Sequence, residues 1–175
     1  DEMRKMRRKL QMVFQDPYGS LNPRMKVQDL IGEPLLIHTN MSAGERLKKV
    51  HELLGTVGLS PSHGERYPHE FSGGQRQRLS IARAIARKPE ILIFDDSFSA
   101  LDFLTEANLR RSLNEKIQGK TQIVITQRIT SAMNADHIFV MDRGRLVDHG
   151  VHAELLSRCK IYQEIYASQT GGDAK

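Results

Sequence analysis

The second half of the chain alternates short apolar runs with segments of helical character, and this alternation restricts the folds that it can adopt. A helix expected over Ser72–Lys88 is followed by the apolar run Ile91–Phe94, and a helix over Phe103–Gln118 is followed by the run Gln122–Thr126. Short apolar runs between helices are typical of buried strands in a parallel sheet. We therefore predict an α/β fold, a mostly parallel sheet covered by helices, with ligands bound at the carboxyl ends of its strands.

The C-terminal pattern predicts a third strand, a hairpin and two closing helices. The third strand is expected over Ile138–Met141, and Arg143-Gly144 is typical of a hairpin turn into Arg145–Asp148. The closing helices are expected over Ala153–Arg158 and Ile161–Ser168.

The N-terminal part predicts one further strand, over Leu10–Gln15, and a helical lobe. Helices are expected over Val27–His38 and Ser42–Leu54, and Ser42 stands three residues before Glu45, the spacing of a capping box. Residues 26–70 are expected to lie outside the sheet. We predict three parts, namely an edge of the core at 1–25, a helical subdomain over 26–88 and the remaining core over 89–175.

Composition excludes several classes of protein. The hydrophobic and charged fractions, 39% and 27%, are those of a soluble globular domain. No apolar run approaches the roughly 18 residues of a membrane helix, and the first ten residues lack the apolar stretch of a secretory signal. The single cysteine, Cys159, excludes an internal disulfide, fits a reducing compartment and is interpreted as a packing residue or bystander. The net charge of +5 permits nucleic acid or an anionic membrane as a partner without requiring either.

Two segments have residue types suited to nucleotide chemistry. In the run FSGGQRQR, Ser72 stands at a helix N-cap with Gln75 three residues later, and the glycines between them would let a phosphate approach the backbone N–H groups. Asp95 and Asp96 follow the strand ILIF, where a carboxylate can hold hydrated Mg²⁺ beside phosphates. Each segment alone also fits a plainer interpretation, a capped helix and an Asp-Asp-Ser turn.

Together, these motifs resemble the ATP-binding cassette (ABC) family over residues 10–168. Gln15 in VFQDP resembles the family's Q-loop glutamine, which reaches Mg²⁺ and faces the transmembrane partner. Asp95 resembles the Walker B aspartate, which is a Mg²⁺ ligand in the family. The segment that begins at Ser99 and ends at Asp102 resembles the D-loop. The residues that resemble the signature, which in the family binds ATP held by the opposite subunit, are Ser72, Gly73, Gly74 and Gln75.

The resemblance implies a fold, cofactors and partners. The fold would be an incomplete P-loop NTPase (RecA-like) core with an inserted α-helical subdomain, and the cofactors would be ATP and Mg²⁺. The expected partners are a second nucleotide-binding domain that carries Walker A and a transmembrane permease, with no nucleic acid. The expected location is cytoplasmic, peripheral on the inner face of the cell membrane.

The chain departs from the family at the phosphate loop. Walker A requires G-x-x-x-x-G-K-[ST], but the only Gly-Lys-Thr run begins at Gly119 and has Asn114 in place of the first glycine. We interpret Gly119 as a helix C-cap residue. Because the family's Walker A precedes the Q-loop, we expect a fragment with little or no autonomous hydrolysis and with exposed apolar surface that favours association.

Two substitutions at the expected catalytic positions also indicate an impaired site. Asp96 stands where active cassettes have a glutamate that orients or deprotonates water, and its side chain is one methylene shorter. Gln127 stands where the switch histidine should contact the γ-phosphate, and glutamine cannot shuttle a proton. This pair resembles the degenerate site of heterodimeric exporters.

The two halves of the chain also resemble different branches of the family. Residues 12–78 resemble oligopeptide or dipeptide importer ATPases, whereas residues 79–168 resemble heterodimeric multidrug exporters, which suggests a chimera with its seam near the signature helix. Two other functions stay open, a cassette ATPase of DNA repair or translation and a non-catalytic module that docks a permease.

Two further groups of residues suggest other functions. A metal site is suggested by residue type alone at Asp148, His149, His152 and Glu154. A nucleic-acid surface is suggested by the arginines Arg76, Arg78, Arg83 and Arg87. We interpret the first group as a solvent-facing turn, because its spacing matches no metal signature. With 6% aromatic residues, we interpret the second as a solvated helix face or as nucleotide-facing arginines.

Overall fold

The computed structural model describes residues 6, 9–17 and 19–171, and in it the chain forms two compact units, residues 1–125 and 126–175. The basic residues at positions 4, 5, 7 and 8 and the tyrosine at position 18 lie outside the described residues. The functional division at residues 25 and 88 stays a prediction.

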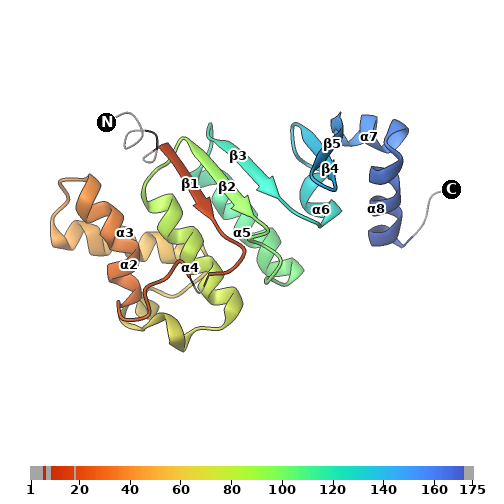
Figure 1. Cartoon of the computed structure of the whole chain (residues 1–175). Helices are drawn as coiled ribbons and strands as arrows, with labels where there is room; N and C mark the ends of the chain where they lie inside the picture. Colours follow the sequence, from red (N-terminus) through yellow and green to blue (C-terminus); the bar gives the residue numbers. More distant parts are fainter. Residues whose placement is uncertain (1–5, 7–8, 18, 172–175) are drawn as a thin grey trace. The chain divides into compact units, whose positions relative to one another are not determined.

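Unit 1 is built on a three-stranded parallel sheet in the order β1-β2-β3 (Figure 1). β1 spans Leu10–Val13, β2 spans Ile91–Asp95 and β3 spans Thr121–Ile125. Parallel strands and covering helices confirm the predicted α/β class. β1 ends two residues earlier than expected, before a segment dense in turn-forming residues.

One face of this sheet forms the core of unit 1. Leu92 and Phe94 of β2 are buried, and they belong to one hydrophobic cluster with residues of α4 (Gly73–Ala86) and α5 (Phe103–Lys116). Both helices begin and end within two residues of the predicted bounds. Their starts are marked by N-cap residues, Ser72 for α4 and Asp102 for α5.

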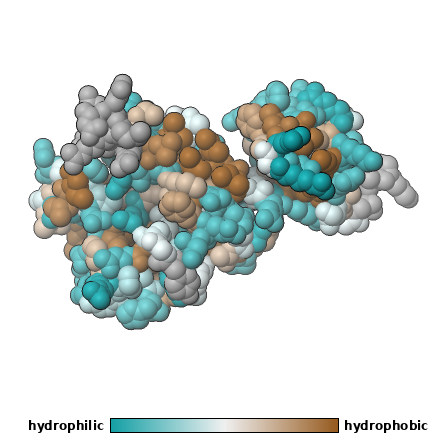
Figure 2. Space-filling view, in the orientation of Figure 1, coloured by the Kyte–Doolittle hydropathy of each residue, from teal (hydrophilic) through white to brown (hydrophobic). Residues whose placement is uncertain are grey.

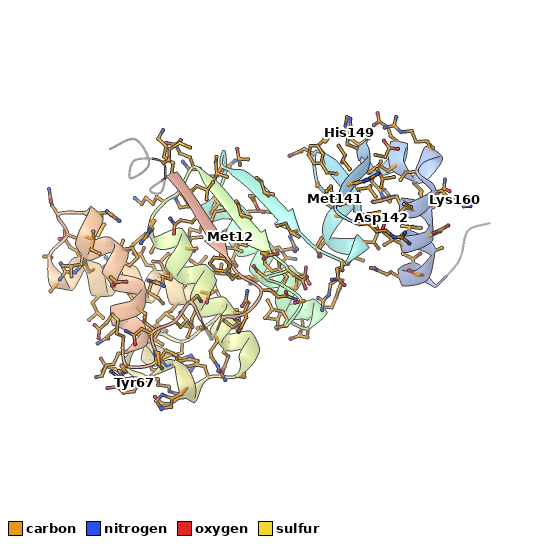
Figure 3. All side chains as sticks on the ribbon, viewed as in Figure 1. Met12, Tyr67, Met141, Asp142, His149 and Lys160 are labelled. Carbon is orange, nitrogen blue, oxygen red and sulfur yellow. The ribbon has the colours of Figure 1, made fainter. Side chains whose placement is uncertain are left out.

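The other face of the sheet is apolar and uncovered among the described residues. Met12, Ile93 and Ile123 are in register across the three strands, and Met12 and Ile123 are 36% and 47% exposed. Ile125 is 50% exposed. Figure 2 shows apolar surface on unit 1, and Figure 3 places Met12 on β1. The strands were predicted to be buried, and on this face of the sheet that prediction is wrong. The exposed apolar side chains agree with the separate prediction of exposed apolar surface.

A helical lobe precedes α4 in sequence and packs against it. α2 spans Val27–His38 as predicted, and α3 spans Ala43–Thr56 behind a capping box of Ser42 and Glu45. The Gly- and Pro-rich stretch after α3 contains two 3₁₀ turns. These are η1 (Pro61–Glu65) and η2 (Pro68–Glu70).

Unit 2 contains an antiparallel hairpin of β4 (Ile138–Asp142) and β5 (Arg145–Gly150). The turn residues Arg143 and Gly144 have φ of 45° and 76°, the left-handed values of a tight hairpin. The helices of this unit are α6 (Ile129–Ala132), α7 (His152–Arg158) and α8 (Lys160–Thr170).

The strand predicted over residues 138–141 does not continue the parallel alternation, because among the described residues it pairs only with β5. Ile138 and Val140 are buried in a small core that also contains Cys159, so the cysteine is a packing residue as interpreted. On the other side of the hairpin Phe139 and Met141 are 63% and 58% exposed, and Figure 3 labels Met141 there.

Candidate functional site

The carboxyl ends of β1 and β2 bring Gln15 and Asp95 to one pocket. Gln15 follows β1 by two residues, and Asp95 is the last residue of β2, the neighbouring parallel strand. The pocket is open, has a volume of about 520 Å³, and is lined also by Phe14, Asp16 and Ser20. Sequence reasoning expected both residues to serve the same ion, and the fold places them where that is sterically possible.

Asp96 stands beside them in a strained backbone conformation, with φ of 43°. Its N–H donates to the Ile125 carbonyl oxygen of β3 at 2.8 Å, and its carboxylate accepts a hydrogen bond from Gln15 Nε2 at 3.2 Å. Aspartate tolerates the left-handed region better than most residues. The turn therefore points the Asp96 carboxylate toward the glutamine.

The residues predicted as the signature form the N-terminus of α4. Ser72 Oγ accepts from the Gln75 N–H at 3.3 Å, and Gln75 Oε1 accepts from the Ser72 N–H at 2.9 Å, which confirms the capping box. At Gly73 a Cβ would meet nothing within 4 Å. At Gly74 a Cβ would stand 3.1 Å from the Ala100 carbonyl oxygen, so the backbone packs closely on the D-loop there.

The residues predicted as the D-loop hold the turn after β2 and the start of α5. Ser99 Oγ donates to the Asp96 carbonyl oxygen at 2.8 Å. Asp102 caps α5 by accepting from the Thr105 N–H at 2.9 Å, and hydrogen bonds from Thr105 lower the pKa of the Asp102 carboxyl. Both residues hold local structure, a role that the sequence pattern did not reveal.

Gln127, which we predicted at the switch position, belongs to unit 2. It follows β3 by two residues, is exposed, and its backbone carbonyl accepts from Gln169 Nε2 of α8 at 2.7 Å. The switch segment is thus joined to the C-terminal helix of its own unit.

Three of the four signature-helix arginines bind backbone carbonyls of unit 1. Arg83 donates to the Ser20 carbonyl at 2.6 Å and pairs with Glu33 at 3.1 Å. Arg78 donates to the Val57 and Gly58 carbonyls at 3.2 and 2.9 Å, and burial lowers its pKa. Arg76 donates to the Phe71 carbonyl at 2.9 Å. All three are only partly buried, so they have a structural role in unit 1, and the interpretation as solvated or nucleotide-facing arginines stays a prediction.

The run interpreted as a solvent-facing turn is held by an ion pair. Arg158 Nη2 lies 3.1 Å from an Asp148 carboxylate oxygen, and this contact lowers the pKa of the Asp148 carboxyl. Within the described ranges no group of three or more His, Cys, Asp or Glu is arranged to hold a metal ion.

A hydrated Mg²⁺ ion fits the pocket at the sheet edge by its donor set. Mg²⁺ is commonly bound by one or two carboxylates, with waters and phosphate oxygens completing the octahedron. Asp95 is half-buried at the pocket wall, and the Gln15 amide and the Asp96 carboxylate are within hydrogen-bond distance of one another. Asp95 and Gln15 line the pocket and could hold the ion directly or through water, with Asp96 hydrogen-bonded to Gln15 behind them.

Comparison with known proteins agrees with these motifs. A family profile described as "ABC transporter" matches residues 1–99. The oligopeptide transport ATP-binding protein OppF of Bacillus subtilis is 51% identical over 81% of this chain and 48% of its own length. The dipeptide transport ATP-binding protein DppF of Escherichia coli is 42% identical over 86% of this chain and 46% of its own length. The chain thus spans about half the length of these curated relatives.

Solved structures show the same fold. The ATP-binding cassette MJ0796, a dimer in a post-hydrolysis state bound to ADP and Pi, matches with a TM-score of 0.79 and 32% identity over 86% of this chain and 66% of that chain. A bacterial Atm1-family ABC exporter with ATP bound matches with a TM-score of 0.77 and 29% identity over 94% of this chain and 29% of that chain. No helix in the described part of the chain has the length and apolar character of a membrane span. The chain belongs to the ABC transporter family, and over most of its length it is similar to oligopeptide and dipeptide transport ATP-binding proteins.

Proposed function

We propose that this chain supplies the Q-loop, signature and Walker B elements of an ATP-binding subunit that drives peptide transport across a membrane. The observation that carries the proposal is the meeting of Gln15 and Asp95 in one pocket, in the same unit as the capped N-terminus of α4. The relatives named for oligopeptide and dipeptide transport support peptides as the cargo. The expected partners remain a second cassette and a permease, with a peripheral position on the cytoplasmic face.

The signature would act on an ATP molecule held by the partner cassette. The N-terminus of α4 carries backbone N–H groups that point out of the helix and the positive end of the helix dipole, both of which favour a phosphate group. Gly73 leaves that end sterically open, and Ser72 fixes the entry of the chain into the helix. When bound, Mg²⁺ would supply charge neutralisation of phosphate oxygens.

Association with a complete cassette tests this role. The chain should form a complex with the OppF relative from B. subtilis in the presence of Mg²⁺ and a non-hydrolysable ATP analogue, measured by sedimentation velocity. Gly73→Asp should abolish the complex, because it places a negative charge where the phosphate would bind. Gly44→Asp is the matched control in the first turn of α3, where a Cβ also meets nothing within 4 Å, and it should leave association unchanged. Equal association of both variants would refute the signature role.

Autonomous hydrolysis is expected to be little or none. Asp96 and Gln127 replace the residues that the family uses for chemistry, and a misplacement of about 1 Å can cost on the order of a hundredfold in rate. The sequence contains no G-x-x-x-x-G-K-[ST] run for a phosphate loop. Phosphate release by the purified chain should be no higher than that of Asp95→Asn, and a steady rate that stops in Asp95→Asn would contradict this.

The exporter-like character of residues 79–168 stays a separate proposal, supported by Asp96 and Gln127 and by the likeness to an exporter structure. The similarity to OppF covers 81% of the chain, so it extends beyond residue 78 into that half. A single genomic open reading frame with peptide-importer relatives along its full length would refute a chimera.

A further inference from the structure

Two consecutive backbone carbonyls at the end of β1 are held by side chains from different elements. Ser97 Oγ, in the turn after β2, donates to the Val13 carbonyl oxygen at 2.8 Å. Gln77 Nε2, in the second turn of α4, donates to the Phe14 carbonyl oxygen at 3.0 Å. Gln15 is the next residue, so the path of the chain into the pocket is held from two sides.

The orientation of the Gln77 amide is determined by its surroundings. The side chain is 1% exposed, and its Oε1 atom is buried with no hydrogen-bond partner in the described part of the structure. Rotating the amide by 180° would place this oxygen against the Phe14 carbonyl and lose the existing bond as well. A buried acceptor without a partner is costly, and the hydrogen bond that Gln77 donates to Phe14 is the interaction that offsets this cost. The donated hydrogen bond is therefore the contribution specific to glutamine here.

The same side of α4 also holds the far end of the segment 14–20, which we call the Q-loop segment. Ser80 Oγ lies 2.9 Å from Ser20 Oγ, and Arg83 donates to the Ser20 carbonyl at 2.6 Å. Gln77, Ser80 and Arg83 are three residues apart in turn, a spacing that places them along one side of a helix. The Q-loop segment is fixed to α4 at both ends, whereas the Gln15 side chain between them is exposed and reaches Asp96.

We propose that Gln77 is a positioning residue for Gln15, and that through it the signature helix sets where the Q-loop amide stands at the Asp95 edge of the sheet. The positioning of Gln15 by Gln77 does not depend on the proposed function. Its consequence, metal binding at that edge, rests on the proposed function. Since coupling between sites is reciprocal, an ion bound at this edge would in turn restrain α4.

Nuclear magnetic resonance of the purified chain tests the positioning directly. The reporter is the side-chain NH₂ signal of Gln15, first without metal and then with Mn²⁺, whose unpaired electrons broaden nearby signals. Gln77→Met keeps the length of the side chain and removes the donor. Ser80→Ala is the matched control, because it removes a contact between the same side of α4 and the same segment, but at Ser20.

In the wild-type chain Mn²⁺ should broaden the Gln15 side-chain signal together with the Asp95 amide signal. Gln77→Met should shift the metal-free Gln15 signal and weaken Mn²⁺ binding by about tenfold, the lower end of what loss of an outer-shell partner costs a metal site. Ser80→Ala should leave both unchanged. Should Gln77→Met fail to fold, Ser97→Ala, which removes the Ser97 bond to Val13, is expected to shift the same signal.

The outcomes separate the positioning from the metal site. Absence of Mn²⁺ broadening in the wild-type chain, with a Gln15 shift in Gln77→Met, would reject the metal role and keep the positioning. A Gln15 signal that is the same in wild type and Gln77→Met, or that Ser80→Ala shifts equally, would overturn the proposal.

Discussion

The two signature glycines should respond in opposite ways to alanine. At Gly73, the first residue of α4, a Cβ would meet nothing within 4 Å, so Gly73→Ala should stabilise the chain by up to about 0.5–1 kcal/mol through helix propensity. At Gly74 a Cβ would stand 3.1 Å from the Ala100 carbonyl oxygen and 3.2 Å from Leu101 Cδ2. The Leu101 side chain can rotate, but the Ala100 contact is backbone and requires the D-loop to move. Such overpacking costs about 1–3 kcal/mol, which offsets the propensity gain.

Urea denaturation of the two variants, followed by circular dichroism, measures the difference. We expect the free energy of unfolding of Gly74→Ala to be about 1–3 kcal/mol lower than that of Gly73→Ala, with the same slope against urea concentration. Equal midpoints would show that the D-loop yields freely, and would refute the close packing of signature and D-loop.

Three further perturbations test local contacts. Ser72→Ala should lower the free energy of unfolding by about 1 kcal/mol through loss of the α4 cap, measured by the same urea midpoint. Because hydrogen bonds from Thr105 lower the folded-state pKa of Asp102, its stabilising contribution is present above the unfolded pKa of about 3.9 and is lost as pH falls through the folded value. Asp102→Asn should therefore destabilise the chain in melts at pH 7, and its effect should shrink as the pH is lowered through the folded-state pKa. Arg83→Met should lower the free energy of unfolding by about 1–2 kcal/mol and speed hydrogen exchange in α2. Both effects should be larger than those of Glu33→Gln, because Arg83→Met removes the hydrogen bond to the Ser20 carbonyl as well as the ion pair with Glu33.

Local signals allowed the helices and the capped turns to be predicted. α2 has the predicted bounds, and the Ser–x–x–Glu and Ser–x–x–Gln spacings gave the starts of α3 and α4. Pairing between strands is not local. The apolar pattern of β4 fits a parallel or an antiparallel neighbour equally well, and only the tight turn at Arg143-Gly144 indicated that β5 would be its partner.

Contacts over long sequence distances explain what the sequence could not reveal about the site. Arg83 and Gln77 bind carbonyls 63 residues away, and a carbonyl has no signature in a sequence. The sequence also showed no sign of the φ of 43° at Asp96, which the turn after β2 imposes. In the sequence this residue looked like a simple replacement of glutamate. The order of motifs indicated which residues would gather, but the hydrogen bonds that hold them came only from the fold.

Titration calorimetry of Mg-ATP into the purified chain tests most directly the claim that the phosphates are held by a partner's phosphate loop. We predict no saturable heat at millimolar nucleotide with the chain alone, and none with Asp95→Asn. Saturable binding that Asp95→Asn weakens would show that the chain holds the nucleotide by itself, and would contradict the account.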